Sequence, residues 1–155
     1  YPLSHPASTA LALACSLGKS MGGSSGALYS IFLNAVAVHL GAANVNTPAA
    51  MAAAFSAGCA AMSEYGGASK GHRTMLDALL PAAEAMEAAA AQGKGPAAML
   101  QAAAQAAEAG AEATKSMVAG AGRASYVPDE TLKDVPDPGA KAVAIWLGAG
   151  AGALE

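Results

Sequence analysis

Glycine and serine gather in a segment that separates two apolar stretches of this 155-residue chain. The segment reads Gly22-Gly23-Ser24-Ser25-Gly26. Glycine lets a backbone approach a ligand closely, serine hydroxyls donate hydrogen bonds, and a helix start behind them offers free N–H groups with a positive dipole end. The segment matches neither a Walker A loop nor a dinucleotide fingerprint. It therefore predicts either a phosphate-binding turn or a plain capped turn.

Basic and acidic residues mark the other candidate segments. Lys70 and Arg73 lie where a helix is expected to start, and because cations are disfavoured there they either await an anion or are solvated. Arg123 follows two glycines and is a planar donor suited to phosphate or carboxylate. The acidic residues after it predict either a cation site or a solvated loop: Asp129, Glu130, Asp134 and Asp137.

Composition favours helices as the elements that position these segments. The chain is 54% hydrophobic and holds 45 alanines, the residue with the highest helix propensity. Aromatic residues make up only 5%, which argues against a strand sandwich or barrel. A net charge of −3 excludes the basic surface of a nucleic-acid-binding protein, and the high hydrophobicity excludes disorder.

Apolar spacing and turn residues predict six helices. Their expected ranges are about 6–19, 26–40, 48–65, 73–91, 97–117 and from about 138 or 140 to near the end. Pro81 interrupts the fourth range and is expected to kink it. Short connections and the lack of a strand pattern predict an all-α, antiparallel up-and-down bundle.

The second predicted helix belongs to a long stretch without fixed charge, between Lys19 and Glu64. A membrane span needs about 20 predominantly apolar residues, and polar residues interrupt the best window here. The apolar residues recur instead at the spacing of one buried helix face: Leu28, Ile31, Phe32, Ala35 and Val38. We therefore expect a mostly buried helix of a soluble protein and no contact with a membrane.

Five motifs occur in an order that resembles a known family. They are Met21–Tyr29, Arg73–Leu79, Gly110–Lys115, Gly122–Tyr126 and Asp137–Ala140, spread over about 120 residues. In this order they resemble the nucleotide-binding (DhaL, or DAK2) domain of dihydroxyacetone kinases, in particular the single-chain, ATP-dependent type. The resemblance implies an antiparallel barrel of eight helices with ATP held by loops at one end, of which about six helices are present here.

The resemblance also implies a function. The chain would be the ATP-binding part of a dihydroxyacetone (glycerone) or glyceraldehyde kinase, which transfers the γ-phosphate of ATP to a short keto- or aldo-triose. A companion DhaK-like domain would bind the triose through a histidine. Some animal relatives also cyclise FAD to a cyclic FMN, and this activity stays open. The alternative is a non-catalytic helical assembly module derived from the kinase domain.

Eight residues match positions that bind ATP or ADP in the family, and none matches a catalytic residue. They are Ser24, Ser25, Gly66, Met75, Arg123, Asp137, Pro138 and Gly139. The resemblance implies that the two serines contact the phosphates and that Gly66 and Met75 line the pocket. The arginine would make a polar contact, and the last three residues would close over the nucleotide.

One departure from the family concerns magnesium. The family binds Mg²⁺ with an Asp-Gly-Asp-x-x-Gly loop, and these 155 residues contain no such motif. We therefore expect one partial domain over residues 1–155, with Mg²⁺ ligands and further helices supplied by a preceding segment, and no kinase activity of the isolated chain. The uncovered apolar face predicts a homodimer or larger assembly. The cytoplasm is the expected compartment, with a plastid as the alternative.

A second departure lies at His72, where the family usually has aspartate. An aspartate at a helix start caps the helix and complements its dipole, whereas histidine does so less well. The sequence therefore predicts weakened local order around Arg73 and Met75.

Overall fold

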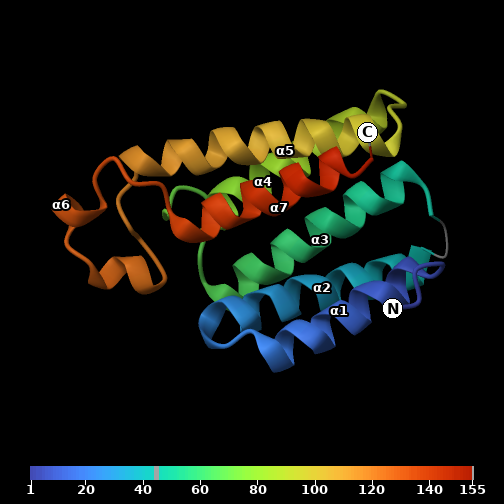
Figure 1. The fold of residues 1–155 in the computed structure, drawn as a ribbon, viewed down its shortest axis with the longest axis horizontal. Coiled ribbons are helices and arrows are strands. Elements are labelled where there is room, and N and C mark those ends of the chain that lie inside the picture. The colour runs from blue at the N-terminus through green and yellow to red at the C-terminus, as the bar shows by residue number, and fades with distance from the viewer. Residues whose placement is uncertain (44–45, 155) are drawn as a thin grey trace. The chain divides into compact units, whose positions relative to one another are not determined.

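The computed structural model describes residues 1–43 and 46–154, and the elements in this part of the chain are helices and turns. The prediction of an all-α chain is confirmed. In chain order the elements are α1 (Pro6–Ser20), α2 (Gly23–Ala43), α3 (Pro48–Gly66), α4 (Leu76–Ala91), α5 (Pro96–Ala113), the 3₁₀ turns η1 (Thr114–Ser116) and η2 (Arg123–Tyr126), α6 (Asp129–Leu132) and α7 (Pro138–Gly152) (Figure 1).

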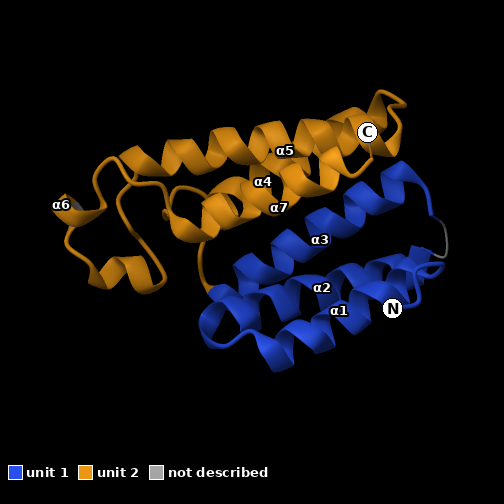
Figure 2. Ribbon diagram, viewed as in Figure 1, with its two compact units in different colours: residues 1–66 blue, residues 67–155 orange. Residues whose placement is uncertain are grey.

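The chain divides into two compact units, Tyr1–Gly66 and Gly67–Glu155 (Figure 2). In unit 1, α2 packs against both α1 and α3. In unit 2, α5 packs against both α4 and α7, and α4 also contacts α7. The two 3₁₀ turns and the four-residue α6 lie in the connection between α5 and α7.

Two aromatic rings organise the core of unit 1. Phe32 of α2 and Phe55 of α3 meet edge to face, with ring centroids 5.1 Å apart. A Cβ on Gly58 would lie 2.6 Å from the Phe32 ring, so the missing side chain leaves room for it. Small residues thus set the distance between α2 and α3.

Alanines form the packing face of α5 in unit 2. Ala103, Ala107 and Ala111 follow one another at helical spacing, and none of them is exposed to solvent. Close packing also occurs at Gly110, where an added Cβ would lie 2.1 Å from the carbonyl oxygen of Asp77 in α4. Pro81 cannot donate the helical hydrogen bond to that carbonyl, yet α4 continues through it.

The long helices lie close to their predicted ranges, with two corrections at their starts. Helix α2 begins at Gly23 rather than near Gly26, so most of the Gly-Ser segment is the first helical turn and not a break. Helix α4 begins at Leu76 rather than near Arg73, whose φ of 57° is left-handed and cannot continue a helix. The predicted polar loop after residue 123 contains η2 and α6.

Helix α2 is more exposed than predicted. By length and composition it is apolar and long enough to cross a membrane, and 17% of its apolar window is buried. Its buried residues are Gly26, Phe32, Ala37 and Leu40. The expectation of a mostly buried helix is therefore wrong, and Val38, placed on the predicted buried stripe, is 74% exposed.

Candidate functional site

The start of α2 presents hydroxyl groups to solvent. Gly23 has a φ of +68°, which glycine adopts without strain, and Ser24 and Ser25 are exposed in the first turn. Gly26 is buried, and an added Cβ would lie 1.9 Å from the carbonyl oxygen of Met21. The first turn holds no acidic residue. This helix start thus combines free backbone donors, two hydroxyls and a positive dipole end, which together suit an anion.

Gly66 lies at the same end of unit 1 as the two serines. It is the last residue of α3, and an added Cβ would lie 2.9 Å from Cδ2 of Leu28, about one turn after Ser24. Unit 1 therefore brings together the three predicted site residues that it contains.

The start of α7 is closed by its own carboxylate. Oδ2 of Asp137 accepts a hydrogen bond of 2.8 Å from the backbone N–H of Ala140. The backbone N–H of Asp137 donates to Oγ1 of the buried Thr114 at 2.7 Å. Pro138 occupies the first helical position, where its missing N–H costs nothing.

Gly139 lies close to both Asp137 and Met75. An added Cβ on Gly139 would lie 3.0 Å from Oδ2 of Asp137 and 3.3 Å from Cβ of Met75. Met75 precedes α4 and is 8% exposed. Unit 2 therefore places Met75 beside the Asp137-Pro138-Gly139 corner.

Burial raises the pKa of the Asp137 carboxyl above its usual value. The N–H groups of Ala140 and Gly139 and the charge of Arg73 act in the opposite direction, while the charge of Asp77 adds to the rise. The folded protein thus holds this carboxylate at a cost that its hydrogen bonds only partly offset.

Arg73 fits neither alternative that the sequence left open. It is 1% exposed, and its Nη2 donates to the carbonyl oxygens of Val135 at 2.9 Å and of Leu132 at 3.4 Å. Lys70 is exposed and pairs with Glu84 at 3.4 Å. Arg73 is therefore an internal structural donor and not a solvated or anion-awaiting charge.

Asp77 accepts hydrogen bonds from the segment that precedes α4, whose cap residue Met75 makes no side-chain cap hydrogen bond. Oδ1 of Asp77 accepts from the N–H of Gly71 at 2.5 Å, and Oδ2 accepts from the N–H of Thr74 at 2.8 Å. The carbonyl of His72 accepts from the N–H of Gly120 at 3.1 Å. Because α4 begins at Leu76, position 72 does not lie at its start and is not its cap. The weakened local order expected around Arg73 and Met75 stays a prediction.

Arg123 lies in η2 and is exposed. Gly122 before it has a φ of +72°, and Oγ of Ser125 closes the turn on the Gly122 carbonyl at 2.7 Å. The guanidinium is thus available to solvent, as a ligand-binding arginine must be.

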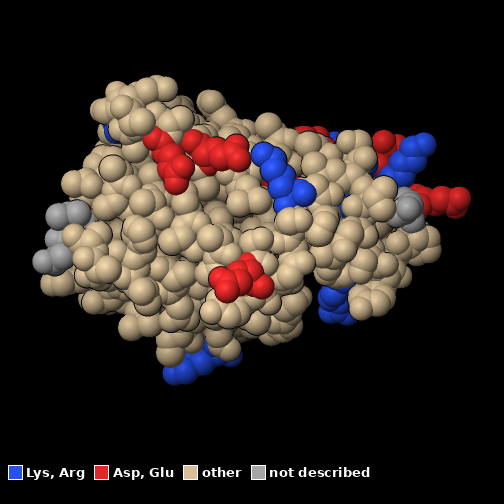
Figure 3. Space-filling model, turned by 180° about the vertical axis from the view of Figure 1, so that it is seen from behind, with Lys and Arg blue, Asp and Glu red and all other residues tan. Residues whose placement is uncertain are grey.

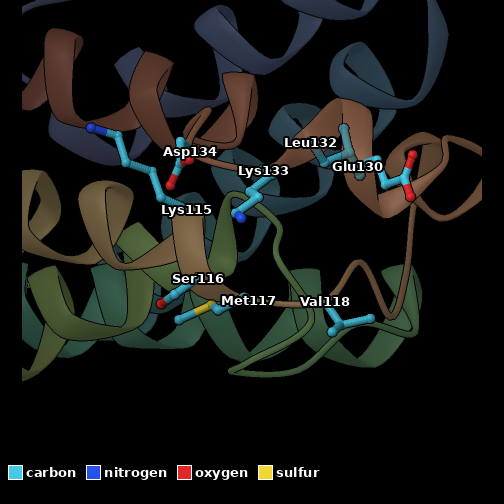
Figure 4. A pocket seen from close by; sticks show the side chains of 8 residues that line it. All are labelled: Lys115, Ser116, Met117, Val118, Glu130, Leu132, Lys133 and Asp134. Carbon is cyan, nitrogen blue, oxygen red and sulfur yellow. The ribbon is translucent and has the colours of Figure 1, made fainter.

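A groove of about 460 Å³ lies near the end of α5 and was not predicted from the sequence (Figure 4). Residues from the two segments 115–118 and 130–134 line it, and they carry both signs of charge: Lys115, Ser116, Met117, Val118, Glu130, Leu132, Lys133 and Asp134. The side chains in the described part of the chain form no group of three metal-binding residues. The cation-site alternative for the acidic loop therefore receives no support.

Charged side chains are sparse on the surface shown in Figure 3. One small network links the outer face of α5 to α7 and η1: Lys141 pairs with Glu108 and Glu112, and Lys115 pairs with Glu112. Hydrogen bonding to Glu108 raises the pKa of Lys141, and hydrogen bonding to Lys115 lowers that of Glu112. These exposed pairs contribute little to stability.

Known proteins resemble this chain over nearly its whole length. Putative 3,4-dihydroxy-2-butanone kinase of Solanum lycopersicum is 49% identical over 157 residues, which cover 100% of this chain and 26% of that protein. Triokinase/FMN cyclase of Homo sapiens is 47% identical, with 94% of this chain and 25% of that protein covered. The chain thus spans about a quarter of the length of these relatives.

Solved structures show the same fold. The dihydroxyacetone kinase of C. freundii in its native form matches with a TM-score of 0.73 and 38% identity, over 98% of this chain and 24% of that one. The same enzyme in complex with AMP-PNP and Mg²⁺ matches with a TM-score of 0.70. The family model described as the DAK2 domain matches residues 2–151. The resemblance drawn from the five motifs is confirmed, and the chain belongs to the DAK2 domain family.

Proposed function

We propose that this chain is the ATP-binding part of a dihydroxyacetone or glyceraldehyde kinase. The observation that carries the proposal is the start of α2. There Ser24 and Ser25 are exposed beside the free backbone N–H groups of the first helical turn, which holds no acidic residue. A relative with the same fold has been crystallised with AMP-PNP and Mg²⁺, which supports a nucleotide as the ligand.

The proposed contacts follow the chemistry of the nucleotide. Ser24 and Ser25 would donate to the phosphates, with Gly66 beside them and the exposed Arg123 as a further phosphate donor. The carboxylate of Asp137 repels a phosphate, so the Asp137-Pro138-Gly139 corner and Met75 would contact the nucleoside.

Phosphoryl transfer depends mainly on positioning and on stabilisation of charge on the phosphoryl oxygens. Backbone N–H groups, two hydroxyls and one guanidinium provide that kind of stabilisation. No residue of this chain is assigned as a nucleophile or base, because the triose would be bound and presented by a DhaK-like domain.

The described residues do not fit a magnesium site, since they hold no cluster of three carboxylates, histidines or cysteines. The Mg²⁺ ligands would come from an aspartate-rich loop outside these 155 residues, which would form one partial domain. The isolated chain is expected to show no turnover with ATP and a separate DhaK domain.

The relatives contain this region as about a quarter of a longer protein, so it works beside other domains there. In this chain Ile145 and Trp146 of α7 are 64% and 37% exposed, which supports a covering partner. The proposed partners are further helices of the same domain, the DhaK-like domain and a second copy. A cytoplasmic location is proposed, with a plastid as the alternative.

The test is to measure the binding of AMP-PNP by isothermal titration calorimetry. Replacing both Ser24 and Ser25 by alanine removes two hydroxyl donors to a charged group, and we expect affinity to fall by about tenfold or more. Ser8→Ala is the matched control, because Ser8 is an exposed serine in the first turn of α1. A parent chain that assembles but binds no AMP-PNP would favour the assembly module instead.

A further inference from the structure

Arg73 is an unusual residue within unit 2. Among the described residues it is the largest fully buried side chain, with 1% of its surface exposed, and its backbone φ is +57°. A left-handed backbone is unfavourable for an arginine, and burial of a guanidinium requires good partners. Both features persist only if the surrounding structure needs the side chain at this place.

The guanidinium holds both ends of one turn. Nη2 donates to the carbonyl oxygens of Leu132 and Val135, and the Val135 N–H closes the turn on Leu132 at 3.2 Å. Lys133 has φ −59° and ψ 134°, and Asp134 has φ +61°, the dihedrals of a type II turn. This turn leads directly to Asp137.

A second nitrogen of the guanidinium, Nη1, lies near the start of α7. Nη1 lies 3.9 Å from Oδ1 of Asp137, beyond hydrogen-bond distance. In the described part of the chain Nε and Nη1 are buried without a hydrogen-bond partner. Buried unpaired donors are costly, so Arg73 favours any arrangement that brings Oδ1 closer.

We propose that Arg73 is a positioning residue: by fixing the 132–135 turn and attracting Asp137, it sets the Asp137-Pro138-Gly139 corner for the nucleoside part of the ligand. The inference rests on the proposed nucleotide-binding function. It assigns no contact between Arg73 and the ligand, because the side chain is enclosed by the protein.

The test compares two probes, AMP-PNP and inorganic tripolyphosphate, which lacks the nucleoside. Arg73→Lys keeps the charge but loses the planar guanidinium, whose Nη2 donates to both carbonyls while Nη1 lies toward Asp137. We expect this variant to bind AMP-PNP about tenfold more weakly while its affinity for tripolyphosphate changes by less than about twofold. The double serine variant should lose affinity for both probes.

Amide hydrogen exchange over residues 130–137 provides a readout of the turn itself. Faster exchange of the Val135 amide is expected in Arg73→Lys, with Lys94→Ala as a control at an exposed position outside the turn. Arg73→Met, of similar length but without charge, should exchange faster still. If Arg73→Met does not fold, the lysine variant alone decides.

Three results separate the inferences. A parent chain that binds neither probe overturns the proposed function and this inference with it. A parent that binds AMP-PNP, with Arg73→Lys unchanged in affinity and in exchange, overturns this inference alone. Equal loss of both probes in Arg73→Lys also overturns it, because that pattern reports a general structural defect.

Discussion

Two helix starts in this molecule have the same positive dipole end, but only one of them is already occupied by a side-chain carboxylate. Helix α2 begins with Gly23, Ser24 and Ser25, exposed and without an acid in the first turn. Helix α7 begins after Asp137, whose carboxylate accepts the N–H of Ala140. A helix N-terminus therefore attracts an anion from solvent only where the chain has not supplied one of its own.

The two starts also differ in what supports them. The α2 corner depends on close backbone packing, since Gly26 lies against the Met21 carbonyl. The α7 corner depends on buried polar groups, because Thr114 accepts the Asp137 N–H and Arg73 faces its carboxylate. The predictions below break or sharpen this contrast.

The largest effect is expected from Gly26→Ala. Its Cβ would lie 1.9 Å from the Met21 carbonyl oxygen, so the backbone of the α2 corner must move. We expect unfolding free energy to fall by about 3 kcal/mol, the upper range for overpacking, and AMP-PNP binding to be lost. Urea denaturation measures the first and calorimetry the second. Gly41→Ala is the control, because nothing lies within 4 Å of its Cβ, and an unchanged Gly26→Ala would contradict the packing.

Ser24→Asp should make the start of α2 resemble that of α7. A carboxylate in the first turn is expected to raise unfolding free energy by about 0.5 kcal/mol. It should also lower AMP-PNP affinity by about tenfold through charge repulsion. Ser24→Asn is the uncharged control. Gain of stability without loss of affinity would show that phosphate does not bind at this start.

Asp137→Asn tests how much the burial of the Asp137 carboxylate at the start of α7 lowers stability. In the unfolded chain the carboxyl titrates near 3.8, and burial raises the pKa in the folded protein. The folded state then binds more protons between the two values, so the contribution of this group to stability falls as pH rises through that window. Asparagine keeps the cap without titrating.

The stability of Asp137→Asn relative to the parent should therefore improve as pH rises from 3.8 through the raised folded pKa, and stay constant above it. Urea denaturation at a series of pH values measures this difference. A difference that moves in the opposite direction would mean that the hydrogen bonds to the carboxylate outweigh its burial.

The smallest effect is expected at Asp134, in the turn that Arg73 holds. Its φ of +61° is a position where glycine is favoured, so Asp134→Gly should raise unfolding free energy by about 0.5 kcal/mol. Thermal unfolding measures the change. Asp134→Ala keeps the unfavourable backbone and should not stabilise; a gain there equal to that of glycine would exclude backbone strain as the cause.

Much of the fold followed from local patterns. The helix starts predicted near residues 48 and 97 lie at Pro48 of α3 and one residue earlier, at Pro96 of α5. Such features depend on neighbours within one or two turns, and the sequence displays those directly.

The sequence by itself determined an all-helical chain of the DAK2 family with a Gly-Ser turn at a helix start. Only the tertiary structure decided that Arg73 is buried, that Asp77 receives the N–H groups of Gly71 and Thr74, and that much of α2 is exposed. Arg73 donates to carbonyls 59 and 62 residues away along the chain. Backbone carbonyls carry no residue-specific signal, so no local pattern identifies such partners before the chain has folded.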